Sequence, residues 1–254
     1  MKFLKLDLSA DNLSTKISGT SQLLVEITKE NVKEVQLELQ NSLTISGIKI
    51  NAVPTTFSHA SGLVKIQVAD PHQGDLLDIS ITYSGEPNPA SNGIFAGINN
   101  DFSNAWGNQV TWTLSEPFNA KYWWPAKQDL NDKIDSIKVY ITTSNHLKVG
   151  SNGLLKNIVP LSNNRVRYEW VSKYPIAYYL IAFTIGEYVE YIHYAYPQAL
   201  NGDSILIQNY IYNNPETLPN YQDELDLVPR MLELFSTYFG LYPFHEEKYG
   251  HVMA

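Results

Sequence analysis

The 254-residue sequence contains no cysteine, which excludes disulfide bonds, zinc–thiolate centres and cysteine nucleophiles. It also lacks any apolar run near the ~18 residues that a membrane-spanning helix needs. The most apolar run, residues 176–185, instead predicts a buried strand. Residues 1–18 lack the long apolar core of a secretory signal. We therefore expect a soluble protein without a transmembrane segment, either cytoplasmic or exported with its signal removed.

Positive charge is scarce as well. Lysine and arginine number 18 against 26 aspartates and glutamates, so the net charge is −8. Binding to the phosphate backbone of nucleic acid is therefore not expected as the main activity. The hydrophobic fraction of 44% is typical of a globular protein, and the length allows one large domain or two smaller ones.

Several catalytic motifs are missing: there is no G-x-S-x-G, G-x-G-x-x-G or P-loop sequence. The terminal "LYPFHEEKYGHVMA" resembles the zinc motif H-E-x-x-H only superficially. His245 and Glu246 are adjacent, but His251 follows six positions later, roughly 240° around a helix. Pro243 and Gly250 also disfavour a helix here. We predict a loop at His245 and no metal site in this chain.

Alternation of apolar and polar residues dominates the first two hundred positions and predicts strands with one buried face. The alternating segments are 23–27, 35–39, 64–68, 77–83, 137–141 and 166–170. Turn sequences such as "SG" at 46–47 and "SNG" at 151–153 separate them. This arrangement predicts a mainly β fold with an antiparallel, saddle- or sandwich-like domain.

The pattern changes near residue 190. Residues 205–212 predict one more strand, and a helix with one apolar stripe is expected from Leu225, Val228, Leu232, Phe235 and Phe239. Gly240 is expected to end this helix. Pro229 must either open the helix in its first turn or kink it. We predict an amino-terminal β domain at 1–190 and the start of a second domain at 191–254.

Aromatic residues concentrate in "TWTLSEPFNAKYWWPAKQDLNDK", residues 111–133. Trp112, Trp123 and Trp124 could form a packed sheet edge, or they could form an exposed platform for a ligand such as a sugar. Glu116 stands before Pro117, where the strand pattern ends. It could be a solvated glutamate, or it could bind a cation such as a peptide α-ammonium group.

The segment "SEPFNAKYWWPAKQDLNDK" resembles a signature of the aminopeptidase N family of zinc metallopeptidases (gluzincin aminopeptidases). Three further stretches resemble family segments in the same order. They are "SNGLL" at 151–155, "YPIAYYLIAFTIGEY" at 174–188 and "LELFSTYFGLYPFHEEKYG" at 232–250. The resemblance thus spans nearly the whole chain.

The resemblance implies an amino-terminal β domain followed by one strand and one helix of an incomplete thermolysin-like α/β domain. The H-E-x-x-H motif and the zinc would lie downstream in the full-length enzyme, so this truncated chain should bind no zinc and be inactive alone. The substrate would be a peptide with a free amino terminus.

The resemblance also aligns Glu116 with a family residue that binds the substrate α-amine. Leu114 replaces a frequent glutamine, Ala126 a cysteine and Leu130 a proline of the family pattern. Two alternatives remain open at this point. One is a non-catalytic β-sandwich module that binds carbohydrate or protein, and the other is a catalytically dead scaffold relative.

Overall fold

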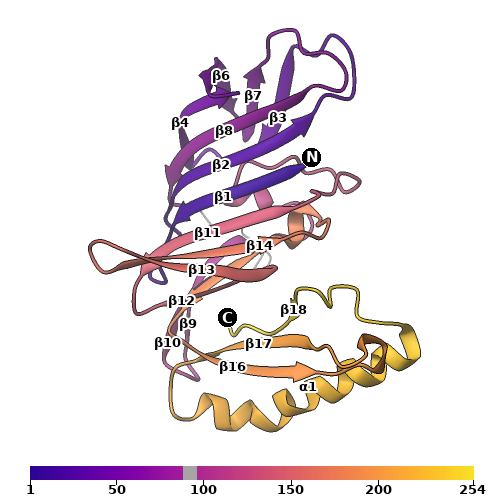
Figure 1. The fold of residues 1–254 in the computed structure, drawn as a ribbon. Helices are drawn as coiled ribbons and strands as arrows, with labels where there is room; N and C mark the ends of the chain where they lie inside the picture. The colour runs from indigo at the N-terminus through magenta and orange to yellow at the C-terminus, as the bar shows by residue number, and fades with distance from the viewer. Residues whose placement is uncertain (88–95) are drawn as a thin grey trace.

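A computed structural model describes residues 1–87 and 96–254, and its largest element is an eight-stranded sheet (Figure 1). Across the sheet the strand order is β13-β14-β11-β1-β2-β8-β4-β5. Neighbours are antiparallel except for the parallel pair β1 and β11. The strand bounds are β1 Phe3–Ser9, β2 Ile17–Glu26, β4 Leu43–Ile50, β5 Val53–Pro54, β8 Leu76–Gly85, β11 Ile137–Ser144, β13 Leu154–Leu161 and β14 Arg165–Ser172.

Two smaller antiparallel sheets pack with the large one. The first has the order β12-β15-β10-β9, with β12 Lys148–Ser151, β15 Phe183–Gly186, β10 Asn108–Leu114 and β9 Gly97–Ser103. The second has the order β3-β7-β6, with β3 Glu34–Glu38, β7 Leu63–Gln67 and β6 Phe57–Ala60. One continuous hydrophobic core takes residues from all three sheets. This core positions the segment that follows β10.

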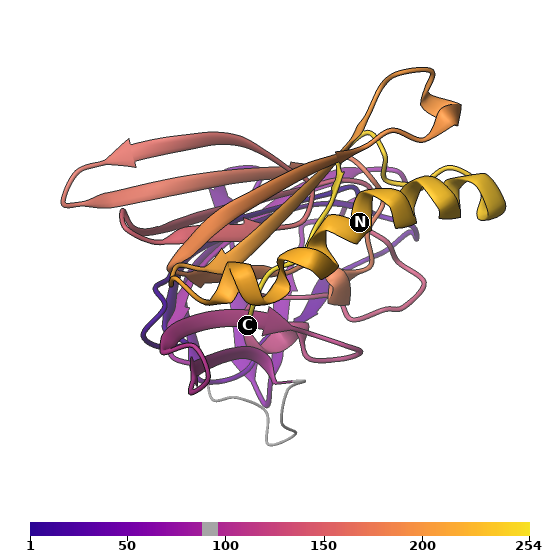
Figure 2. The ribbon, with the colours of Figure 1, turned by 90° about the horizontal axis from the view of Figure 1, so that it is seen from below.

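The carboxyl-terminal part forms a separate small sheet and a helix. The sheet has the order β16-β17-β18, with β16 Tyr188–Ala195, β17 Ile205–Tyr212 and β18 Lys248–Tyr249. Helix α1, Thr217–Phe239, lies beneath β16 and β17 in Figure 1 and crosses them in Figure 2. The described residues also form three 3-10 turns: η1 Ala120–Tyr122, η2 Tyr178–Leu180 and η3 Gln198–Leu200.

The predicted β class is confirmed, and all six alternating segments overlap strands. The strand predicted at 205–212 coincides with β17. The single strand predicted at 176–185 is wrong, because η2 occupies its middle and, apart from the isolated bridge at Ile176, only residues 183–185 lie in a strand, β15. The side chain of Asn152 explains the break. Its Nδ2 donates to Leu180 O at 3.0 Å and its Oδ1 accepts from Ala182 N at 2.7 Å, replacing strand pairing there.

Helix α1 is confirmed, but it begins well before its apolar stripe. Asn214 Oδ1 accepts hydrogen bonds from the backbone nitrogens of Glu216 and Thr217, at 3.0 and 2.9 Å, and so satisfies the first free donors of the helix. Pro229 therefore lies in the helix interior rather than in its first turn. Gly240 follows the last residue with φ +93°, as expected for a helix stop.

Candidate functional site

The segment between β10 and η1 holds Glu116 by fixing the residues on both sides of it. Ser115 is buried, and its hydroxyl accepts from Trp123 Nε1 at 2.9 Å. Ser115 O accepts from Asn119 N at 2.9 Å, and the Tyr178 hydroxyl donates to Pro117 O. The backbone around Glu116 is therefore anchored to the large core from two directions.

The Glu116 side chain is half-buried. Its Oε2 is buried and has no hydrogen-bond partner among the described residues. A buried carboxylate oxygen without a donor is costly, whereas a cation supplied by a ligand would give it a charge-assisted hydrogen bond. The unpaired oxygen is compatible with the predicted ligand-binding role of Glu116, which stays a prediction.

The tryptophans of this segment do not form a platform. Trp123 and Trp124 are fully buried and meet edge to face with ring centroids 6.3 Å apart. Trp112 is half-buried and donates from Nε1 to Asp101 Oδ2 at 2.8 Å. The interpretation of these three rings as an exposed sugar-stacking strip is wrong, because packing behind β10 removes two of them from solvent.

Charged residues on both sides of Trp123 and Trp124 make ion pairs within the fold. Lys121 Nζ lies 3.0 Å from Glu38 Oε2, and Asp132 Oδ1 lies 2.6 Å from the amino-terminal nitrogen of Met1. Partial burial alone would raise the pKa of Asp132, but its bonds to Lys127 and to the terminal ammonium lower it. These ion pairs attach the loop of residues 115–133 to β3 and to the start of the chain, so they have a structural role and do not form a binding site.

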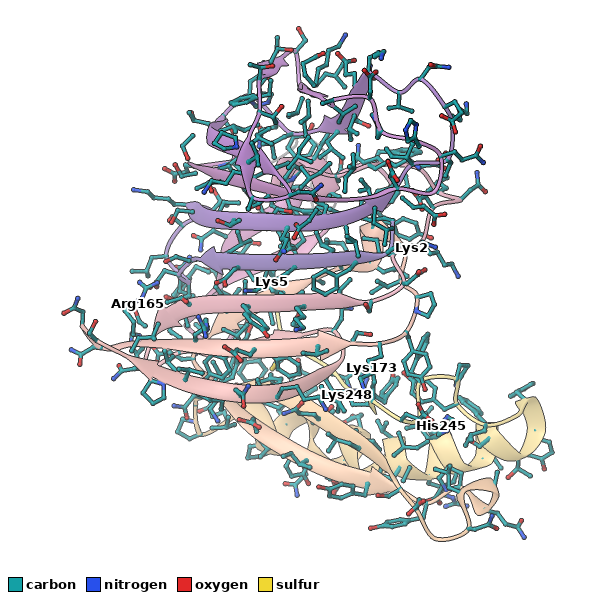
Figure 3. All side chains as sticks on the ribbon, turned by 45° about the horizontal axis from the view of Figure 1, so that its top comes forward. Lys2, Lys5, Arg165, Lys173, His245 and Lys248 are labelled. Carbon is teal, nitrogen blue, oxygen red and sulfur yellow. The ribbon has the colours of Figure 1, made fainter. Side chains whose placement is uncertain are left out.

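The terminal histidines are separated, and each is bonded locally. His245 lies in a loop after α1, as predicted, with Nδ1 3.1 Å from Tyr242 O (Figure 3). His251 Nδ1 lies 2.9 Å from Asn209 Oδ1, and burial lowers the pKa of its ring. Within residues 1–87 and 96–254, no three His, Asp or Glu side chains gather as metal ligands. The described donors therefore do not fit a zinc ion.

Lys248 on β18 was not singled out from the sequence. It lies between the large sheet and β17 in Figure 3, where Nζ donates to Ser151 O at 2.8 Å. The amine also sits 5.0 Å above the Trp170 ring, and burial lowers its pKa to about 8. It lines a cleft of about 350 Å³ and a second of about 480 Å³. A lone lysine in a polar loop gives no sequence pattern from which this burial could be read.

Solved structures provide the informative comparison. The chain is similar to the crystal structure of an M1 zinc metallopeptidase from Deinococcus radiodurans, with TM-score 0.80, 18% identity, and coverage of 100% of this chain and 55% of that chain. It shares the M1 metallopeptidase fold over its entire length. A mutant of the D. radiodurans protein bound to a Tyr-Ser-Ala substrate gives the same TM-score and identity, covering 100% of this chain and 56% of that one.

A two-domain M1 zinc metallopeptidase mutant bound to L-arginine gives TM-score 0.80 and 17% identity, with the same coverage of 100% and 56%. The chain therefore spans only about half the length of the structures that it matches. No model of a known protein family and no curated protein matches the sequence. In the part of the chain that the structure describes, no helix has the length and apolar character of a membrane span.

Proposed function

We propose that this chain is the amino-terminal region of a zinc-dependent aminopeptidase, of the aminopeptidase N type, that removes amino-terminal residues from peptides. The fold shared with M1 zinc metallopeptidases along the whole chain supports this proposal, as does a neighbour bound to a tripeptide. Residues 1–190 would form the amino-terminal β domain, and 191–254 the beginning of the catalytic domain. The four ordered sequence motifs add support that the fold alone does not.

Glu116 carries the proposal. An aminopeptidase must recognise a free α-ammonium group and place the scissile bond one residue away from it. Glu116 Oε2 has no partner among the described residues and is suited to accept a hydrogen bond from that ammonium group. Anchoring of Ser115 and Pro117 on either side would hold the carboxylate at a constant distance from the reacting bond.

Zinc belongs to the longer protein in this proposal. It would supply the Lewis-acid chemistry of peptide hydrolysis. The described residues offer no three-ligand group, so no step is assigned to it in this chain. The chain alone is expected to bind no stoichiometric zinc and to hydrolyse no aminoacyl-anilide. Elemental analysis and a turnover assay test both points, and finding either zinc or turnover would contradict them.

The role of Glu116 is tested in a longer protein that contains H-E-x-x-H. Glu116→Ala should raise KM for peptides with a free amine by about 10- to 100-fold, the range of one lost charge-assisted hydrogen bond. Glu116→Gln should have a smaller effect, and Glu224→Ala, an exposed carboxylate on α1, should have none. Unchanged kinetics in Glu116→Ala would refute the assignment. Absence of turnover in the unmodified longer protein would instead indicate a catalytically dead scaffold.

A further inference from the structure

A third cleft, of about 460 Å³, is lined by residues at the tip of the β9–β10 hairpin and just before α1, and Glu116 is not among them. The hairpin and the start of α1 lie near each other in Figures 1 and 2. Three other connections border it: the chain after β1, the turn between β11 and β12, and the residues next to the β16–β17 pair. The sequence around the hairpin, "NNDFSNAWGNQ", is rich in amides. This cleft shares no lining residue with the two clefts at Lys248, and binding there would not require the proposed peptidase activity.

Hydrogen bonds hold the cleft open as part of the fold. Asn214 Nδ2 donates to Asn108 Oδ1 at 3.0 Å and to Trp106 O at 3.4 Å, which ties the hairpin to the start of α1. On the opposite side, Asn12 is 5% exposed, and its Nδ2 donates to Gln109 O at 3.1 Å. The walls are therefore fixed before any ligand arrives, which lowers the entropic cost of binding.

Polar atoms on these walls remain available. Neither the Asn12 Oδ1 nor the Asn108 Nδ2 makes a hydrogen bond to a described residue, and the same holds for the Gln109 Oε1. The side chains of Asn213 and Glu187 also line the cleft and are exposed. The cleft thus presents donors and acceptors together, which matches hydroxyl groups because each hydroxyl both donates and accepts.

Two aromatic rings also line the cleft. Phe102 is 55% exposed on β9, and Trp106 is half-buried at the hairpin tip. Edge contact with Tyr221 of α1, at a centroid distance of 5.8 Å, orients the Trp106 ring. A turn closed by Gly107 N donating to Ser103 O at 2.7 Å holds this tip in place. Exposed ring faces beside amide groups suit a ligand with one apolar face and a rim of hydroxyls.

The charges of the cleft select against anions. Of the described residues that line it, none is lysine or arginine, and one, His146, is a histidine. The negative charge of Asp11 is partly balanced by Arg165, whose Nη1 lies 3.9 Å from Asp11 Oδ2. Glu187 makes no ion pair with the described residues. We propose that this cleft is a binding site for a neutral saccharide, in which the amides bind hydroxyl groups and Phe102 or Trp106 packs against the sugar ring.

To test this, the 254-residue chain is titrated with cellotriose, xylotriose, maltotriose and triacetylchitotriose. Binding is measured by calorimetry and by the shift of the NMR signal of the Trp106 indole. At least one probe should bind with Kd below about 10 mM, as expected for a small open site. The Trp106→Phe variant identifies the indole signal. Absence of binding by all four probes up to about 10 mM would overturn the proposal.

Variants locate the site. Phe102→Ala should weaken the binding of the saccharide that the unmodified chain binds by at least about fivefold, the loss expected for one aromatic contact. Phe102→Tyr should keep the affinity of the unmodified chain. Phe235→Ala is the matched control, because this ring is 48% exposed on α1 outside the cleft. Equal affinity of Phe102→Ala and the unmodified chain would contradict the site. Binding of acetyl-lysine methylamide in place of every sugar would show a cation site and would also overturn the proposal.

Discussion

The two parts of the molecule on either side of residue 188 differ in how completely they bury their apolar residues. The strands before it share one core that contains three fully buried tryptophans, Trp123, Trp124 and Trp170. Beyond it, the buried cluster between the small sheet and α1 consists of Ala195, Ile205, Ile207 and Leu232. The other face of the small sheet joins the large core through Tyr188, Tyr210 and Tyr212.

Helix α1 shows the consequence of this difference. Leu225 and Leu232 are buried, but Phe235 and Phe239 from the same predicted stripe are 48% and 83% exposed. Leu227, Met231 and Tyr238 are exposed as well. Most helical stability in proteins comes from packing of an apolar face, so α1 is held by few contacts. The large core therefore stabilises the first part, and the second part depends on its attachment to that core.

The largest effect should come from the centre of the large sheet. Leu6 is fully buried on β1, and Leu6→Ala should lower the free energy of unfolding by about 2–5 kcal/mol. Leu232→Ala should cost about half as much, because Leu232 is 8% exposed in a four-residue cluster. Urea denaturation measures both. Equal losses of unfolding free energy in the two variants would contradict the proposal that the first part is packed more completely than the second.

Pro229 allows the stability of α1 to be changed separately from that of the large core. A proline in a helix interior lacks the N–H that would bond one turn back and costs up to about 3 kcal/mol relative to alanine. Pro229→Ala should therefore slow amide hydrogen exchange in α1 while leaving β1 and β2 unchanged. Slower exchange throughout the molecule would instead show that the helix and the large core open together.

Lys248 joins the two parts, and its titration provides a pH test. Burial lowers its pKa to about 8 from the ordinary 10.5, so the unfolded chain binds more protons between these values. Stability should therefore rise by about 2 kcal/mol from pH 8 to 10. Above pH 10 the trend should reverse, because burial raises the pKa of Tyr212 to about 12.

Lys248→Met is the control for this titration. It keeps the side-chain length and removes the charge, so the rise between pH 8 and 10 should disappear. The measurement is urea denaturation in parallel at both pH values. A rise that persists in the variant would mean that other groups cause it.

The smallest effect is expected at the end of α1. Phe239 is 83% exposed, so Phe239→Ser should change the free energy of unfolding by less than about 0.5 kcal/mol. Thermal denaturation at several protein concentrations measures the change. A loss above about 1 kcal/mol would show that this ring has a packing partner in solution.

Sequence patterns predicted the strands and α1 because period-2 and period-3.6 repeats report directly which face of an element is buried. They failed at residues 176–185, where a continuous apolar run has no period and the Asn152 side chain breaks the strand. Sequence patterns also did not decide whether Trp112, Trp123 and Trp124 pack in a sheet edge or form an exposed ligand platform. Exposure depends on which sheet covers them, and that is a long-range property.

By itself, the sequence determined the β class, the position of the helix and the absence of thiol chemistry, and the resemblance of its motif to the aminopeptidase N family singled out Glu116 as the candidate carboxylate. Tertiary structure alone decided that Glu116 Oε2 has no partner in residues 1–87 and 96–254, that Lys248 is buried against Trp170, and that an amide-rich cleft forms beside Trp106. The reason is physical. Local periodicity follows from backbone geometry, whereas partners and clefts arise where segments distant in sequence meet.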